Sequence, residues 1–276
     1  MALPAFALFG SQLSVNLGAA IAKHLFPLIG VEGITAFRVG FSALLLLLVF
    51  RPWRSALTRR DVVNVLIYGT VMGLMNLLIY RAFARIPIGV AVAIEVTGPL
   101  LVALLSSLRP RNIATCALAV VGLCLLLPVR GGERLDPVGV AYAFGAAVCW
   151  ALYIVFGKRA ATLRGGQAVA WGMLVAASFI VPLGSITVDP ATLTPPIVLT
   201  GMAIAILSSA IPYSLEMLAL RGLPQGLYSM LSSAAPAVSA MAALLILDER
   251  LSATQWSAIG CIVLASAATA MSARKK

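Results

Sequence analysis

The sequence is poor in charged residues, and above all in acids. Of its 276 residues only 11% are Asp, Glu, Lys or Arg, with 9 acids against 20 bases. A soluble domain carries roughly 25% charged residues, about twice this fraction. The scarcity of charge excludes an ordinary soluble domain, and the scarcity of acids argues against a metal-rich active site.

Several catalytic and metal-binding patterns are missing as well. The sequence has no G-x-x-x-x-G-K-[ST] loop, which argues against ATP as the energy source, and neither an H-E-x-x-H nor a G-x-S-x-G motif. Its single histidine, His24, and its four cysteines, none in a C-x-x-C pair, form no cluster with metal-ligand spacing. We therefore expect no cofactor, no metal and no enzymatic activity. An ion channel is a further alternative, and it would be expected to show ring-forming repeats in an oligomer or a selectivity motif.

Hydrophobic residues make up 61% of the chain and come in long runs. Runs of roughly 18–22 residues are long enough to cross a bilayer core of about 30 Å, and backbone groups in lipid favour helices. The N-terminal run has no basic n-region and exceeds signal-peptide length, so we interpret it as a retained first span. The expected fold is an all-α polytopic membrane protein with ten spans at roughly 4–23, 31–50, 62–82, 88–107, 112–128, 137–157, 167–186, 197–219, 225–246 and 253–272.

The basic residues lie mainly in the short loops between these spans. If the N-terminus is inside, about thirteen Lys and Arg fall on the inner side and about six on the outer side, although Arg81 and Arg85 dilute the bias. This asymmetry predicts that both termini are cytoplasmic. The basic residues behind the net charge of +11 thus set the membrane orientation by their position in the loops, and we expect no nucleic-acid partner.

Two stretches of sequence indicate an internal repeat. In "ARIPIGVAVAIEVTGP" and "LRGLPQGLYSMLSSAAP", a Pro-x-Gly turn is followed by a second proline, giving Pro87 and Pro99 in the first and Pro224 and Pro236 in the second. The chain is therefore predicted to contain two five-span repeats, 1–130 and 131–276. Because five is odd, the second repeat must be inverted, a plan common among secondary transporters.

Glu95 and Pro99 lie within one apolar span. An ionised acid in a span costs on the order of 2.5–3.5 kcal/mol, and protonating an ordinary carboxyl at pH 7 costs roughly 3.7 kcal/mol. Because these costs are comparable, Glu95 suits proton exchange, or binding of a substrate ammonium group. Pro99 has no N–H for the carbonyl of Glu95, so the site also offers a backbone oxygen. The alternative is a structural ion pair beside a tolerated kink.

Other polar residues within spans are candidates for the same site. Arg38 is predicted at the depth of Glu95, where it could hold a substrate carboxylate, pair only with Glu95, or extend outward. Pro212 is expected to free the carbonyl of Ser208, and Pro236 that of Ser232, which corresponds to Glu95 in the repeat. The remaining candidates for a polar cavity are Asn76, Tyr80, Tyr213 and Glu216. Cross-helix hydrogen bonding and an interfacial acid are the simpler explanations.

The stretches "GLMNLLIYRAFARIPIGVAVAIEVTGPLLVALLSSLRP" and "AILSSAIPYSLEMLALRGLP" resemble the threonine/homoserine exporter branch of the EamA-type drug/metabolite transporters, and "LDERLSATQWSAIGCIVLASA" resembles the end of an EamA repeat. The resemblance implies a ten-helix inverted-repeat bundle with a central cavity. It also implies proton-driven efflux of small amino acids across a bacterial inner membrane. Relatives often carry Glu where this chain has Ala235, so Glu95 and Glu216 remain as the acids to test.

These observations together predict a secondary active transporter that exports threonine-like or homoserine-like amino acids by proton antiport. The alternative is a drug/metabolite transporter that moves another small solute by facilitated diffusion. The expected partners are a small amino acid, the proton and the lipid bilayer, and the sequence is compatible with a homodimer.

Overall fold

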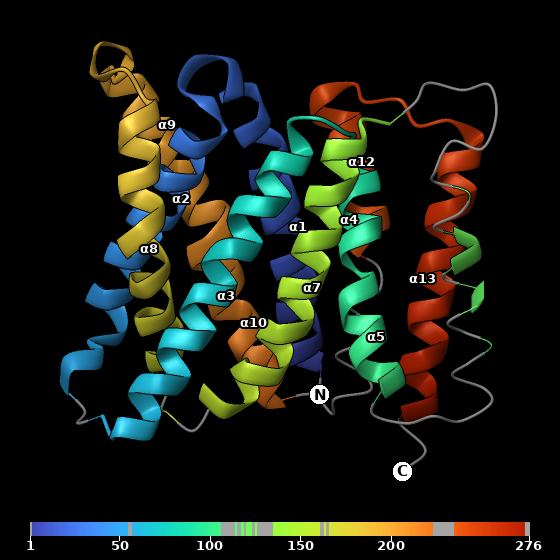
Figure 1. The fold of residues 1–276 in the computed structure, drawn as a ribbon, viewed down its shortest axis with the longest axis horizontal. Coiled ribbons are helices and arrows are strands. Elements are labelled where there is room, and N and C mark those ends of the chain that lie inside the picture. Colours follow the sequence, from blue (N-terminus) through green and yellow to red (C-terminus); the bar gives the residue numbers. More distant parts are fainter. Residues whose placement is uncertain are drawn as a thin grey trace.

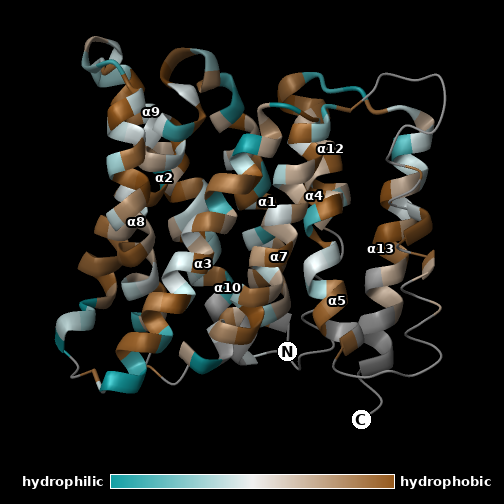
Figure 2. Ribbon diagram, viewed as in Figure 1, coloured by the Kyte–Doolittle hydropathy of each residue, from teal (hydrophilic) through white to brown (hydrophobic). Residues whose placement is uncertain are grey.

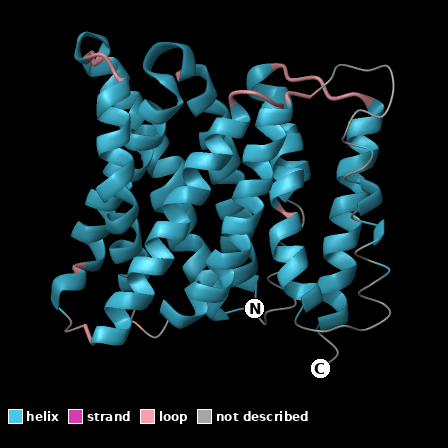
Figure 3. Ribbon diagram, viewed as in Figure 1, coloured by secondary structure: helices cyan, strands magenta, loops and turns pink. Residues whose placement is uncertain are grey.

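The computed structural model describes residues 2–54, 57–105, 135–160, 166–222 and 235–273, together with Leu163 and a few residues between 114 and 125. Within these ranges the chain forms helices and short connections, with no strand (Figures 1 and 3). The helices run roughly alongside one another between two ends of a bundle (Figure 1). The all-helical prediction is therefore confirmed for the described part of the chain.

The helices fall into two groups along the chain. The first group comprises α1 (Ala2–His24), α2 (Phe26–Phe50), η1 (Pro52–Arg54), α3 (Arg59–Phe83), α4 (Ile88–Glu95) and α5 (Thr97–Leu105). The second comprises α7 (Pro137–Ala160), α8 (Gln167–Thr187), η2 (Pro190–Thr192), α9 (Pro195–Ala205), η3 (Ile206–Ala210), α10 (Ile211–Gly222), α12 (Ala235–Leu247) and α13 (Ala253–Ala273).

Within the described residues, six helical segments are long and apolar enough to cross a membrane: Leu3–His24, Phe26–Phe50, Arg59–Phe83, Pro137–Gly157, Gln167–Thr187 and Pro195–Glu216. These correspond to six of the ten predicted spans. Shorter apolar helices cover Ile88–Val102, Ala235–Leu247 and Ala253–Ala265, within three further predicted spans. Most of the predicted span 112–128 and the start of 225–246 lie outside the described residues. Hydrophilic residues gather at the two ends of the bundle, and hydrophobic residues predominate between them (Figure 2).

The predicted start of the second span needs correction. We expected it at residue 31, but α2 begins at Phe26 and continues across Gly30, whose φ of 71° and ψ of 169° are not helical. Glycine adopts a positive φ without a Cβ clash, so it allows the helix to kink and continue. The sequence pattern located the kink and not the true start of the helix.

Small residues let neighbouring helices approach closely. A Cβ on Gly69 of α3 would lie 2.5 Å from the carbonyl oxygen of Gly172 on α8, and one on Gly73 would lie 3.0 Å from the Cβ of Ala176. Such close contact between backbones is a general way to pack helices in membranes, where the hydrophobic effect adds little. It explains how α8 packs against α3.

Two interruptions in the helices place backbone polar groups inside the bundle. The first is at Val96, which separates α4 from α5, with Pro99 one turn further on. The second is η3, a π-helical turn between α9 and α10, followed by Pro212. Near them, α1 packs against α10 and α12, and α4 against α7 and α12. The interruptions therefore lie where helices from both groups meet.

Candidate functional site

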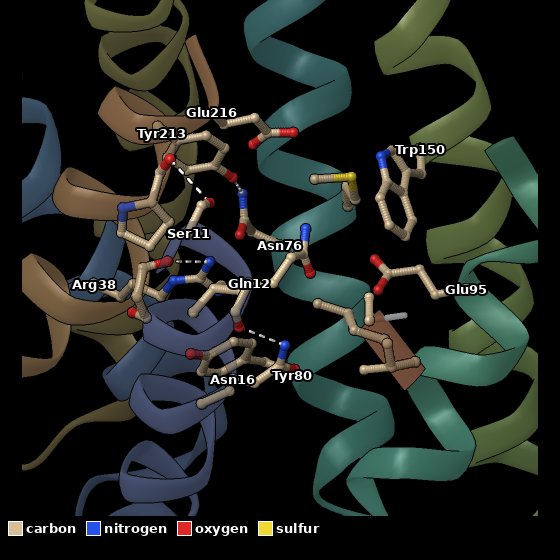
Figure 4. Close-up of a pocket in the computed structure, with 18 of the residues that line it drawn as sticks. Ser11, Gln12, Asn16, Arg38, Asn76, Tyr80, Glu95, Trp150, Tyr213 and Glu216 are labelled. Atoms are coloured by element: carbon tan, nitrogen blue, oxygen red, sulfur yellow. Dashed lines mark hydrogen bonds between the residues drawn. The ribbon is translucent and has the colours of Figure 1, made fainter. Parts of the chain in front are cut away.

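A cavity of about 120 Å³ with polar and apolar side chains in its lining lies where α1, α2, α3, α4, α7, η3, α10 and α12 meet. An engineered apolar cavity of about 150 Å³ holds benzene, so this space suits a small solute or a few waters. The lining residues with a polar group are Ser11, Gln12, Asn16, Arg38, Asn76, Tyr80, Glu95, Trp150, Tyr153, Ser208, Tyr213 and Glu216, most of them labelled in Figure 4. The cavity joins residues that are far apart in the sequence.

Most of the predicted site residues line this cavity. Those that do are Arg38, Asn76, Tyr80, Glu95, Tyr213 and Glu216, and Pro212 lines it too. Ser232 lies outside the described residues. Pro99 and Pro236 lie near the starts of α5 and α12, and the cavity lining does not include them. Ala235, at the position where we noted that relatives carry an acid, is a lining residue, so α12 presents a methyl group there.

Glu95 is the last residue of α4, next to the interruption at Val96. Its side chain is buried but borders the cavity. The Thr97 hydroxyl donates to the Ile94 carbonyl at 2.6 Å, which satisfies one carbonyl at the break. Among the described residues, no hydrogen bond or ion pair to the Glu95 carboxylate is found. The carboxylate is thus available to a ligand or a proton.

Arg38 is also buried, and neutral groups hold it. Its Nε donates to the Ser209 hydroxyl at 2.8 Å and its Nη2 donates to the Ser208 carbonyl at 3.0 Å. The guanidinium carbon lies 4.7 Å from the centre of the Tyr80 ring, a cation–π distance. The hydroxyl of Tyr80 is itself buried, and no described residue is its hydrogen-bond partner.

Arg38 and Glu95 do not pair with each other. The ion pairs of the described residues join other side chains, and Figure 4 places Arg38 and Glu95 on opposite sides of the lining residues. Arg38 does not extend outward either, because only 4% of its surface is exposed. Of the three alternatives for Arg38, two are therefore wrong: an exclusive pair with Glu95, and a side chain that reaches the membrane surface.

Asn76 and Tyr213 join α3 to α10 at the cavity. The Asn76 side-chain amide donates to the Met72 carbonyl at 2.8 Å and to the Tyr213 hydroxyl at 3.3 Å. These residues are related by the repeat offset of 137 residues. Their side chains also serve the cross-helix bonding that was the simpler explanation for them.

Sequence reasoning missed the contribution of α1 and α7. Ser11, Gln12 and Asn16 face the cavity from α1, and Trp150 and Tyr153 face it from α7. Gln12 and Asn16 are four residues apart, and the Asn16 amide donates to the Gln12 carbonyl at 2.7 Å. Polar residues at this spacing share one face of a helix, so the pattern "SQLSVN" could have identified this wall.

The geometry gives the cavity a buried cation on one side and a buried acid on the other. Because these charges are not neutralised by each other, a bound solute that carries both signs would satisfy both. Ile79, Phe83 and Val92 line the cavity too, and they belong to an apolar cluster that continues to Ile86 and Ile88 near one end of the bundle. Buried apolar packing thus borders the cavity on that side.

Comparisons with known proteins agree with this architecture. A family model for the EamA-like transporter family matches residues 137–271. The threonine/homoserine exporter RhtA of Escherichia coli (strain K12) is 42% identical over 275 residues, 99% of this chain and 93% of that protein. RhtA of Salmonella typhimurium (strain LT2) is 41% identical with the same coverage.

Two more distant matches extend the comparison. The uncharacterized transporter YwfM of Bacillus subtilis is 29% identical over 172 residues, 61% of this chain and 58% of that protein. A solved crystal structure has a TM-score of 0.69 at 22% identity and covers 99% of this chain and 97% of that chain, which supports the fold alone. The close matches are transporters, and the chain accordingly belongs to the EamA-like transporter family, as a multi-pass protein of the bacterial inner membrane and not an enzyme.

Proposed function

We propose that this protein exports small amino acids of the threonine and homoserine type across the inner membrane, by proton antiport. The similar exporters support the substrate class. The observation that carries the proposal is the cavity, where buried Arg38 and buried Glu95 lack an ion pair with each other. The substrate carboxylate binds at Arg38. Glu95 accepts either the substrate ammonium group or a proton, so the two exchange at one carboxylate.

We further propose ten spans in two inverted repeats, 1–130 and 131–276, with both termini in the cytoplasm. The hydrogen bond between Asn76 and Tyr213 supports the repeat, because residues related by a two-fold axis can meet only near that axis. The axis then passes close to the cavity, and one repeat rocks against the other around the bound solute. A homodimer remains compatible with this plan.

The experiment is transport by the purified protein in liposomes. When a pH gradient is imposed, radiolabelled threonine and homoserine are expected to move in the direction opposite to the protons, whereas sugars are not. Uptake that is equal with and without the gradient would support the alternative, facilitated diffusion. Transport of none of the amino acids would overturn the substrate assignment.

Ion pairs between the two proposed repeats hold the predicted outer end of the bundle together. Lys23 at the end of α1 pairs with Glu249 at 2.5 Å, and the other Glu249 oxygen accepts from the Ile88 backbone N–H at 3.0 Å. Arg85 pairs with Asp136 at 2.7 Å. The hydrogen bond from Arg85 holds the pKa of Asp136 below its ordinary value, so this contribution persists at neutral pH and is lost as the pH falls through the lowered pKa. Outward opening must separate these contacts.

Glu249→Gln is therefore expected to expose the cavity to the outside more often. Glutamine can still accept from Ile88, but it loses the ionic part of the Lys23 contact. A loss of about 1 kcal/mol would shift the equilibrium about fivefold. The measurement is labelling of a cysteine at Ala19 by a membrane-impermeant thiol reagent, in a background where the native cysteines are replaced. Arg250→Gln is the control, since the Arg250–Asp248 pair is exposed. Equal labelling of the Glu249 variant and the parent would disprove the proposal that the Lys23–Glu249 ion pair keeps the outer end closed.

A further inference from the structure

The span formed by α9, η3 and α10 has two irregularities, and each leaves a backbone carbonyl without its usual helical hydrogen bond. In η3 the N–H of Ile211 donates to Ile206, five residues back, and not to Leu207, four residues back. Pro212 then has no N–H for the carbonyl of Ser208, four residues before it. Both carbonyls would be costly to leave unpaired inside a membrane.

Side chains of the first repeat bind these released carbonyls. The Ser14 hydroxyl of α1 donates to the Leu207 carbonyl at 2.5 Å, and Arg38 Nη2 of α2 donates to the Ser208 carbonyl at 3.0 Å. The next residue, Ser209, supplies its hydroxyl to Arg38 Nε at 2.8 Å. The proline thus leaves the Ser208 carbonyl free beside the Ser209 hydroxyl, and both accept from one guanidinium.

The contacts also fix the direction of the Arg38 charge. One edge of the guanidinium, formed by Nε and Nη2, is bound by Ser209 and Ser208, and one face lies against the Tyr80 ring. The Nη1 group makes no hydrogen bond to any residue that the structure describes, and Arg38 lines the cavity. Because every acceptor is neutral, the positive charge is not cancelled and remains for an anion.

We infer that Pro212 and Ser209 are positioning residues for substrate recognition: they hold the Arg38 guanidinium in the cavity wall with its free edge toward the substrate carboxylate. The inference rests on the proposed function, because it assigns the anion that Arg38 meets. It adds that the helix irregularity in the second repeat is needed for an arginine in the first repeat to bind that anion. A merely structural proline would affect folding alone.

The obvious variants are Ser209→Ala, which removes one acceptor, and Pro212→Ala, which returns an N–H that competes for the Ser208 carbonyl. Ser209→Thr keeps the hydroxyl and serves as the conservative rescue. Pro182→Ala is the matched control, because Pro182 also lies inside a helix, α8, but is exposed and borders no part of the cavity.

The test compares threonine with threoninol, which replaces the carboxylate by an alcohol, as competitors of radiolabelled threonine transport in liposomes. The wild-type protein and the Pro182 variant are expected to prefer threonine. Ser209→Ala and Pro212→Ala are expected to raise the KM for threonine about tenfold with little change in maximal rate. Both are expected to leave threoninol competition unchanged, so the preference for the carboxylate falls, and Ser209→Thr is expected to restore it.

Two other results would be decisive in different ways. Suppose that the wild-type protein transports threonine but does not distinguish it from threoninol. Arg38 then does not bind the substrate carboxylate, and the proposed binding mode fails together with this inference. If Arg38→Lys loses the preference while Ser209→Ala and Pro212→Ala both keep it, the positioning role is overturned and the proposed function stands.

Discussion

Glu95→Gln is expected to abolish pH-driven transport while leaving the protein folded and inserted in the membrane. Glutamine has nearly the same shape as glutamate but cannot exchange a proton. No hydrogen bond or ion pair of the described residues involves the Glu95 carboxylate, so the substitution breaks none. Each pH unit across the membrane is worth about 1.4 kcal/mol per proton, or about tenfold in substrate gradient. The variant is expected to lose this accumulation and to keep at most downhill movement.

The measurement is efflux of radiolabelled threonine from liposomes with and without a pH gradient, with the amount of inserted protein determined in parallel. Glu216→Gln is the matched comparison, because Glu216 is the other acid among the described lining residues. It is only partly buried, so its charge is hydrated more easily, and we expect its variant to keep the pH response. The reverse pattern would move the coupling role to Glu216. Wild-type pH dependence in both variants would contradict proton antiport through either acid.

The sequence predicted the position of the site better than its internal contacts. Glu95, Arg38 and Tyr213 were identifiable because polar groups inside apolar spans are costly and therefore informative. Pro212 even indicated the freed carbonyl of Ser208, and the structure shows Arg38 bonded to it. The distance between Arg38 and Glu95 could not follow from depth alone, because depth does not fix the rotation of a helix about its own axis.

The π-helical turn illustrates a second limit. Nothing in "AILSSA" distinguishes five-residue from four-residue hydrogen bonding, since the choice depends on partners from elsewhere in the chain. Ser14 supplies a donor from α1, and Gly18 lets α1 approach so closely that an added Cβ would lie 2.7 Å from the Cβ of Ser208. Local sequence therefore predicts that a helix is present, and tertiary contacts determine how it deviates.

Gly98→Ala is expected to destabilise the protein strongly, although alanine is the better helix former. Gly98 lies in α5, three residues after Glu95, against the backbone of α7. An added methyl would overlap the carbonyl oxygen of Ala147 and lie 2.8 Å from its carbonyl carbon. Backbone atoms of a packed helix cannot move aside as a flexible side chain can. Overpacking of this kind typically costs about 1–3 kcal/mol.

Gly260→Ala is the matched control, since Gly260 also lies inside a helix, α13, but an added Cβ would meet no atom of the described residues within 4 Å. There alanine is expected to be neutral, or stabilising by up to about 1 kcal/mol. The measurement is the midpoint of thermal aggregation in detergent, where about 2–4 °C per kcal/mol is expected for a chain of this size. The Gly98 variant should melt several degrees below the Gly260 variant.

Because the overlap lies beside the α4–α5 interruption, the Gly98 substitution should also displace Glu95 and lower transport by the protein that remains folded. Equal midpoints would mean that α5 and α7 are further apart in the membrane than described, and that the wall carrying Glu95 is not held by this contact.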